Sequence, residues 1–179
     1  MRPMRQRLPY LLITLGVIAL DQITKFVVDR SMALHESRTL IDGLLSLTYV
    51  RNRGAAFGIL SDADLPHQPV LFTVVSLAAL GAIAFYSFRL PAGSRLPQVA
   101  LALIMGGAVG NLLNRAMFGY VIDFVDAYWG AHHWPAFNVA DSCISIGVAL
   151  LVLDALLAPA EQGAKRQAIP EAASTGGSD

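Results

Sequence analysis

Four long apolar runs dominate the pattern of hydrophobic and polar positions along the chain. They cover about residues 8–28, 69–88, 97–113 and 138–158, and few charged residues interrupt them. A helix needs about 20 residues to cross the hydrocarbon core of a bilayer, and each run is close to that length. The pattern therefore predicts four transmembrane helices in a single membrane domain, residues 1–158.

The more polar segment between the first two runs, about residues 29–68, predicts strands. Asp42 and Gly43 form a hairpin turn signal, and the following LLSLTYV is rich in strand-forming residues. We expect a small β-sheet here, so the predicted fold is an all-α membrane protein with four transmembrane helices and a small extracytoplasmic β-sheet. An ordered loop without a ligand role is the alternative.

Basic residues gather in three regions that four spans would place on one side of the membrane. They are Arg2, Arg5, Arg7, Arg89, Arg95, Lys165 and Arg166. The positive-inside rule assigns that side to the cytoplasm, so we expect both termini there. The tail, residues 159–179, is small, polar and aperiodic, which predicts a disordered cytoplasmic segment.

The first apolar run also has features of a signal peptide, because arginines precede it. However, GVIALDQITK lacks a small-x-small cleavage site, and three more apolar runs follow. We therefore interpret the run as a retained transmembrane helix.

Composition agrees with a membrane protein and argues against several other classes. Hydrophobic residues make up 55% of the 179 residues, charged residues only 15%, and the formal net charge is zero. A neutral chain gives no reason to expect nucleic-acid binding. The four histidines lie outside any HExxH or CxxC pattern, so we expect neither a metal site nor a cofactor.

Polar side chains are few in the apolar runs, and the predicted topology places most of them near the outer leaflet. The set comprises Asp21, Lys25, Asn111, Asn114, Arg115, Asn138, Asp141 and Ser145, with Asp123 in the short connection before the last run. Asp21 and Lys25 are four residues apart, so they can form an ion pair on one helix face. Each polar group alone could be a snorkelling or capping residue. Because polar groups inside a membrane are costly, their convergence indicates a shared functional site.

The third run contains a small-xxx-small pattern between Gly106 and Gly110. Glycines at this spacing allow another helix to approach closely. We interpret them as packing residues.

Asp123 and Asp141 are the best candidates for a catalytic pair. Two carboxylates held close together cannot both ionise easily, so one keeps its proton and the pair can activate a water. Such a pair can hydrolyse an amide by general acid and base catalysis. Asp126 is a rival to Asp123, and it could instead cap or solvate the connection.

Five motifs together resemble the bacterial lipoprotein signal peptidases, the signal peptidase II family. They are DQITK at 21–25, NRGAAFG at 52–58, GGAVGNLLNR at 106–115, VIDFVD at 121–126 and FNVADSCISIG at 137–147. The resemblance covers most of the membrane-embedded chain. It implies four transmembrane helices with an outer β-cradle.

The resemblance also implies an activity and a set of site residues. It indicates an aspartyl endopeptidase of the bacterial cytoplasmic membrane that cuts prolipoproteins before a diacylglyceryl-modified cysteine. Asp123 and Asp141 match the catalytic aspartates of the family. The positions that match its supporting residues are Asp21, Lys25, Asn52, Gly54, Asn111, Arg115, Asn138 and Ala140. The expected partners are diacylglyceryl-modified prolipoproteins and membrane lipids, and we expect a monomer.

The third motif departs from the family pattern at one position. The family usually reads GNxxDR, whereas this chain has Asn114 before Arg115. Asparagine keeps the size and the hydrogen-bonding oxygen of aspartate but loses its charge. We therefore expect activity to survive, without any ion pair that the aspartate would make.

The sequence also supports other expectations at the membrane surface. Tyr120, Tyr128, Trp129 and Trp134 are typical of interfacial anchors. The sheet could pair with an extended substrate segment.

Two other functions compete with the peptidase. Intramembrane acids also mark the ion pathways of transporters, although transporters place them near the midplane. A non-catalytic assembly factor, with the acids merely capping helices, is the third hypothesis.

Overall fold

The computed structural model describes residues 2–54, 68–91 and 93–167. It contains four helices and four strands within these ranges. In chain order they are α1 (Arg2–Ser31), β1 (Ser37–Ile41), β2 (Leu45–Asn52), α2 (Gln68–Arg89), α3 (Arg95–Phe118), β3 (Val121–Trp129), β4 (His132–His133) and α4 (Val139–Gln167).

All four predicted spans are present as helices. Residues 7–31, 70–89, 95–118 and 139–157 are long and apolar enough to cross a membrane. Large apolar side chains on these helices are exposed, as expected for surfaces that face lipid. The fold class predicted from hydropathy is therefore confirmed.

α3 continues several residues past its predicted end at 113. It stops at Gly119, whose φ of 76° is in the left-handed region and whose N–H donates to Arg115 O. Glycine adopts this conformation without a Cβ clash, which makes it a common residue at a helix end. The extra turn carries Asn114 and Arg115 to the junction between α3 and β3.

The predicted hairpin is present, and the sheet is larger than expected. β1 and β2 pair antiparallel, and Gly43 in their turn has a φ of 73°. The sequence placed the sheet in the first outer connection alone, whereas β3 and β4 come from the connection between α3 and α4. The strand order is β1-β2-β3-β4. β2 would otherwise leave its second edge unpaired, and β3 is rich in the β-branched and aromatic residues that favour strands.

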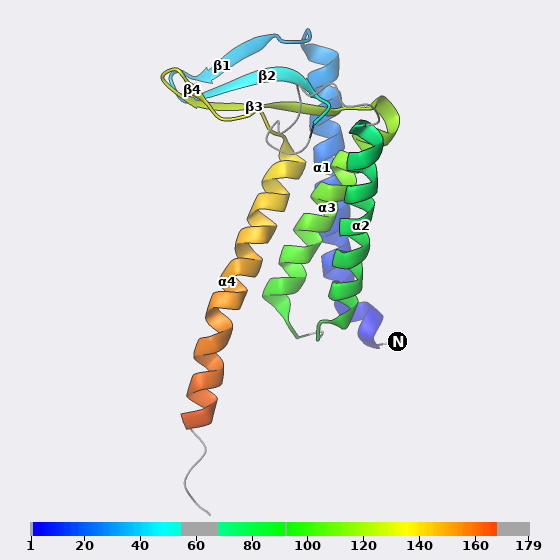
Figure 1. Cartoon of the computed structure of the whole chain (residues 1–179), viewed down its shortest axis with the longest axis vertical. Coiled ribbons are helices and arrows are strands. Elements are labelled where there is room, and N and C mark those ends of the chain that lie inside the picture. Colours follow the sequence, from blue (N-terminus) through cyan, green and yellow to red (C-terminus); the bar gives the residue numbers. More distant parts are fainter. Residues whose placement is uncertain (1, 55–67, 92, 168–179) are drawn as a thin grey trace, which may run out of the picture.

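The sheet lies across one end of the helices (Figure 1). A small core joins the sheet to the helices. It is formed by Val28 of α1, Met32 just after α1, Tyr49 of β2, and Ile122 and Phe124 of β3. α1 begins and α4 ends at the opposite end of the molecule in the same view. The polar residues that the sequence predicted near one leaflet therefore lie at the sheet end.

α4 extends beyond the predicted boundary at 158. It continues to Gln167, so residues 159–167 are helical where the sequence predicted a disordered tail. This segment contains Ala, Glu, Gln, Lys and Arg, which favour helix, as well as Pro159 and Gly163, which do not. The rest of the predicted tail, and residues 55–58 of the second motif, lie outside the described residues.

Candidate active site

The first turn of α4 orients Asp141. Asn138 Oδ1 accepts a hydrogen bond from Asp141 N at 2.9 Å, and Asp141 Oδ2 accepts one from Asn138 N at 3.2 Å. These reciprocal bonds have the form of a capping box, which satisfies N–H groups left free at a helix start. The other carboxylate oxygen, Oδ1, accepts from Asn111 Nδ2 of α3 at 2.8 Å.

Asp123 lies on β3 and is only 2% exposed. Its Oδ1 accepts from Asn138 Nδ2 at 2.7 Å, and its Oδ2 accepts from Asn52 Nδ2 at 2.9 Å. Asn52 is the last residue of β2, and its own Oδ1 accepts from Gly54 N at 2.8 Å. Strand pairing and the bond from Gly54 thus hold Asn52 in the position from which it donates to Asp123.

Asn138 joins the two predicted catalytic aspartates. Its side-chain amide donates to Asp123, while its backbone N–H donates to Asp141. The same amide also lies 3.2 Å from Asn111 Oδ1. The structure therefore brings both carboxylates to one polar cluster, although 17 intervening residues include a strand pair and a turn.

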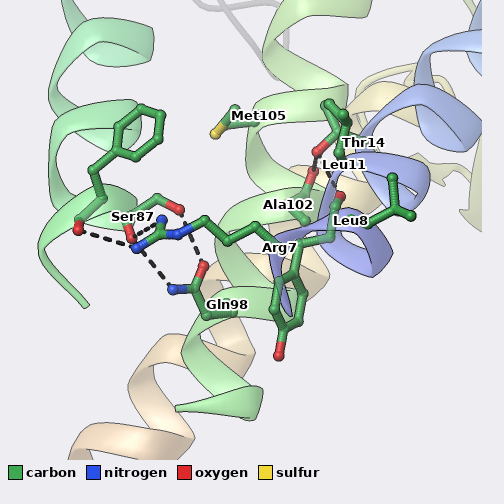
Figure 2. A pocket seen from close by; sticks show the side chains of 10 residues that line it. Arg7, Leu8, Leu11, Thr14, Ser87, Gln98, Ala102 and Met105 are labelled. Carbon is green, nitrogen blue, oxygen red and sulfur yellow. Dashed lines mark hydrogen bonds between the residues drawn. The ribbon is translucent and has the colours of Figure 1, made fainter. Parts of the chain in front are cut away.

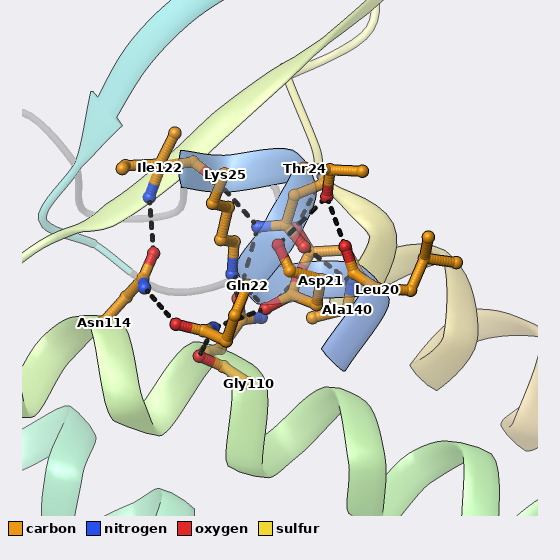
Figure 3. A network of polar contacts seen from close by, with 12 residues as sticks. Leu20, Asp21, Gln22, Thr24, Lys25, Gly110, Asn114, Ile122 and Ala140 are labelled. Carbon is orange, nitrogen blue, oxygen red and sulfur yellow. Dashed lines mark hydrogen bonds and ion pairs between the residues drawn. The ribbon is translucent and has the colours of Figure 1, made fainter. Parts of the chain in front are cut away.

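α1 contributes a buried ion pair to this cluster. Lys25 Nζ lies 2.9 Å from Asp21 Oδ2, as the spacing of the two residues predicted. Lys25 also donates to Asn111 Oδ1 at 2.8 Å. Asp21 Oδ1 accepts from Ala140 N at 3.0 Å, so a carboxylate of α1 binds a free N–H at the start of α4 (Figure 3).

Glycines of α3 make the close approach of the three helices possible. A Cβ built on Gly106 would lie 2.7 Å from Val17 Cβ of α1. A Cβ on Gly110 would lie 2.5 Å from Asp21 Oδ2. A Cβ on Gly107 would likewise clash with the backbone oxygen of Ala140 of α4. The prediction that these glycines serve packing is confirmed.

Asn114 connects α3 to both β3 and α1. Its Oδ1 accepts from Ile122 N at 3.2 Å, and its Nδ2 donates to Gln22 Oε1 at 3.3 Å (Figure 3). Gln22 in turn donates to Asp21 Oδ2 and to Gly110 O. Sequence reasoning missed Gln22, although its place beside Asp21 in an apolar run was an available signal.

Arg115 has no carboxylate within 4 Å in the part of the chain that the structure describes. It donates to Gly54 O at 3.1 Å, and its guanidinium lies 5.9 Å from the centre of the Phe72 ring. Arg115 therefore ties the end of α3 to the residues that follow β2.

Asp126 lies apart from the cluster. It is three residues from Asp123 on the same strand, so the two side chains point to opposite faces of the sheet. Both Asp126 carboxylate oxygens are 3.0 Å from His133 Nδ1 on β4. The geometry thus favours Asp123 over its rival.

The environment of Asp123 raises its pKa to about 7. Burial is the largest cause, because it disfavours the charged carboxylate, and the negative charge of Asp141 adds to it. Hydrogen bonds from Asn52 and Asn138 and the positive charge of Lys25 act in the opposite direction. A proton can therefore remain on this carboxyl near neutral pH.

A pocket of about 340 Å³ lies beside the start of α4 and includes Asp141 in its lining. Its lining consists of Trp134, Phe137, Asp141, Ser142, Ser145 and Ile146. Sequence reasoning placed Asp141 and Ser145 on one helix face and interpreted Trp134 as an interfacial anchor. It missed Phe137, Ser142 and Ile146, although the last two follow Asn138 at helical spacing.

Comparisons with known proteins agree with this architecture. The sequence model of the family described as signal peptidase (SPase) II matches residues 13–157. A lipoprotein signal peptidase of Geobacter sulfurreducens is 53% identical over 142 residues, which are 79% of this chain and 88% of the relative. One from Syntrophus aciditrophicus is 50% identical over 152 residues, which are 84% and 94% of the two chains.

A solved structure of a bacterial membrane enzyme has the same fold. It superposes with a TM-score of 0.73 at 30% sequence identity, over 83% of this chain and 92% of the other. The sequence match, the fold and the clustered polar residues lead to one conclusion: this chain belongs to the signal peptidase II family.

Proposed function

We propose that this chain removes signal peptides from lipid-modified prolipoproteins and that Asp123 and Asp141 perform the cleavage. The observation that carries the proposal is the pair of buried carboxylates held by a single asparagine, Asn138. Two lipoprotein signal peptidases are 53% and 50% identical in sequence to the matched region of this chain. The family supports peptidase activity, and the geometry supports the aspartyl mechanism.

The pair works with one proton and one water. The ionised carboxylate takes a proton from the water as its oxygen attacks the carbonyl carbon, and the protonated carboxyl donates to the carbonyl oxygen. The tetrahedral intermediate then collapses, the C–N bond breaks and the amine leaves with a proton from the pair. The shared proton belongs to both carboxyls, so we assign it to neither alone.

The amides around the pair are positioning groups. Asn52, Asn111 and Asn138 each donate to a carboxylate oxygen, which holds these oxygens in fixed directions. The Asp21–Lys25 pair adds a buried positive charge beside two carboxyls without leaving Lys25 unpaired. Such fixed dipoles stabilise charge in the reaction without having to reorient.

The position of the site suits a substrate anchored in the bilayer. A diacylglyceryl-modified cysteine keeps its acyl chains in the membrane, so the bond before it must be cut near the membrane surface. We infer that the sheet end faces the outer leaflet of the bacterial inner membrane and that both termini are cytoplasmic. β1 is an exposed edge strand in the described part of the sheet, where an extended substrate segment could pair with it.

One chain supplies every polar group in this cluster, so we propose that a monomer is sufficient for catalysis. The same cluster disfavours a transporter, because it lies at the sheet end of the helices (Figure 1). Transport sites usually lie near the midplane. A non-catalytic assembly factor would use the acids only for capping and would tolerate their replacement by asparagine.

The test is cleavage of a purified lipid-modified prolipoprotein by the purified enzyme and its variants. Asp123→Asn and Asp141→Asn each remove an acid–base group and should lower the cleavage rate at least about 100-fold. Mass spectrometry of the products gives both the rate and the bond that is cut. Thermal unfolding of each variant shows whether it still folds.

Asp126→Asn is the matched control, because it makes the same change on the opposite face of β3. It should retain most of the activity. Rapid cleavage by both dyad variants would contradict the aspartyl mechanism. Loss of activity in the Asp126 variant alone would transfer the role of Asp123 to its rival.

A further inference from the structure

A second pocket lies at the end of the helices that is far from the aspartates. It has a volume of about 320 Å³ and is bounded by the start of α1, the end of α2 and the start of α3. Leu8, Leu11 and Met105 contribute apolar walls (Figure 2). None of these residues takes part in the cluster around Asp123 and Asp141.

Arg7 places a positive charge at one side of this pocket. Its Nη1 and Nη2 donate to Ser87 O at 2.9 Å and Phe88 O at 3.1 Å, in the last turn of α2. Gln98, which is 2% exposed, also donates to Ser87 O and accepts from the Ser87 hydroxyl. A polar floor built from three helices thus holds the guanidinium in place (Figure 2).

The charge of Arg7 is not neutralised by these contacts. Carbonyl oxygens carry no formal charge, and no ion pair to Arg7, Arg89 or Arg95 occurs among the residues that the structure describes. Arg89 lies over the Phe85 ring, which leaves its charge in place as well. This end of the bundle therefore has a local excess of positive charge.

The walls of the pocket are membrane-facing surface. Leu8 is 50% exposed and Leu11 is 53% exposed, on a helix long and apolar enough to cross a bilayer. An apolar crevice in such a surface disfavours water and offers space for an acyl chain. A group that combines an acyl chain with a negative charge would match both the walls and the cation.

We propose that this pocket binds one anionic phospholipid, with an acyl chain along Leu8, Leu11 and Met105 and the phosphate facing Arg7. A zwitterionic lipid is a poorer match, because its own cation would approach the excess positive charge. The bound lipid would fill the space between α1 and α2. None of the most apolar stretch of α2 is buried inside the protein, so a lipid at this place would add contacts that the helix lacks.

Native mass spectrometry of the full-length protein tests lipid binding directly. The purified chain is mixed with equal amounts of dioleoyl phosphatidylglycerol and dioleoyl phosphatidylcholine, and retained lipid is identified by mass. A phosphatidylglycerol that carries a photoreactive group on one acyl chain then maps the site in vesicles. We expect one retained phosphatidylglycerol and crosslinks at Leu8, Leu11 and Met105.

Two variants and one control locate the interaction. Arg7→Gln removes the charge and should weaken phosphatidylglycerol binding at least about tenfold. Leu11→Trp fills the apolar side while Arg7 stays in place, so it tests the site even if the Arg7 variant folds poorly. Arg30→Gln is the control. Arg30 is an α1 arginine over the Phe26 ring, as Arg7 lies over the Phe88 ring, but Arg30 is at the sheet end.

The outcomes separate the possibilities. Selective retention of phosphatidylglycerol that Arg7→Gln and Leu11→Trp both reduce, and that Arg30→Gln leaves intact, supports the proposal. Equal retention of the two lipids, crosslinks spread along the helices, or unchanged binding by Leu11→Trp would overturn it. The proposal rests on the transmembrane character of the chain and not on its catalytic mechanism, so failure here leaves the proposed peptidase intact.

Discussion

Asn138 is the residue on which the candidate site depends most directly. Its side-chain N–H donates to Asp123 and its backbone N–H donates to the Asp141 carboxylate. Its side-chain oxygen accepts from Asp141 N. By comparison, Asn52 donates to Asp123 and Asn111 donates to Asp141. A change in the position of Asn138 would therefore alter the spacing of the pair as well as the charge around it.

The raised pKa of Asp123 predicts the pH dependence of cleavage. The proposed mechanism needs one proton on the pair, and the pKa of about 7 at Asp123 means that this proton leaves as the pH rises above neutrality. We therefore expect kcat/KM to fall on the alkaline side of about pH 7. The ordinary pKa of the carboxyl is 3.8, so an unperturbed pair would lose activity far below neutrality.

Cleavage rates measured from acid to mildly alkaline pH check this prediction. Asp126→Asn should show the same alkaline decline, because that carboxyl is bound to His133 and lies outside the cluster. A cleavage rate that stays constant through pH 8 would show that the proton on the pair is not needed.

We expect the contribution of Asn114 to stability to come from its side-chain oxygen, which accepts a hydrogen bond, and not from its lack of charge. Asn114→Asp keeps the acceptor for Ile122 N, whereas Asn114→Leu leaves that buried N–H without a partner. We expect the leucine variant to lose about 1–3 kcal/mol of unfolding free energy and the aspartate variant to lose less and stay active. Unfolding in SDS and the cleavage rate measure the two effects, and equal losses in both variants would contradict this role.

At the scale of elements, α3 is the helix against which the site is assembled. α1 and α4 both approach it through glycines, and its last turn reaches β3 through Asn114. The polar side chains of three helices can meet only because the backbones are close. The geometry of the site therefore depends on how closely the helices pack.

Gly110→Ala tests this dependence. The new Cβ would lie 2.5 Å from Asp21 Oδ2, so the carboxylate that binds Lys25 and Ala140 N must move. We expect a loss of about 1–3 kcal/mol in unfolding free energy together with reduced cleavage. Thermal unfolding and the cleavage assay provide the measurements.

Gly81→Ala is the control for the same substitution in a helix. A Cβ at Gly81 of α2 meets nothing within 4 Å, and alanine favours helix more than glycine does. This variant should be as stable as the parent or slightly more stable. If both substitutions had the same effect, the close approach at Gly110 would not be what positions Asp21.

At the scale of the whole molecule, the arrangement of the helices sets which groups face which side of the membrane. The sheet and the aspartates lie at one end, and the excess positive charge around Arg7 lies at the other (Figure 1). On our proposal, the positive-inside rule places the end that carries the aspartates outside the cytoplasm.

Cysteine accessibility in intact bacterial cells tests this orientation. In a Cys143→Ala background, Asp42→Cys in the β1–β2 turn should react with a membrane-impermeant maleimide added outside. Gly93→Cys, between α2 and α3, should react only after the cells are lysed. The reverse pattern would show that the chain is inserted with the opposite orientation.

The sequence alone determined the four spans, the β1–β2 hairpin and the gathering of polar residues near one leaflet. These features depend on local pattern: hydropathy over one helix length, a turn signal, and spacing on one helix face. It also singled out Asp123 and Asp141, because acids are costly in apolar surroundings. These properties belong to a residue and its chain neighbours.

Only the tertiary structure decided which groups meet. Asp21 accepts from the N–H of Ala140, and β3 pairs with β2. Gln22 of α1 accepts from Asn114 of α3. Arg7 beside the end of α2 is another such contact. Partners of this kind are set by how closely helices and strands pack and in what register, and no local pattern of apolar and polar residues encodes that geometry.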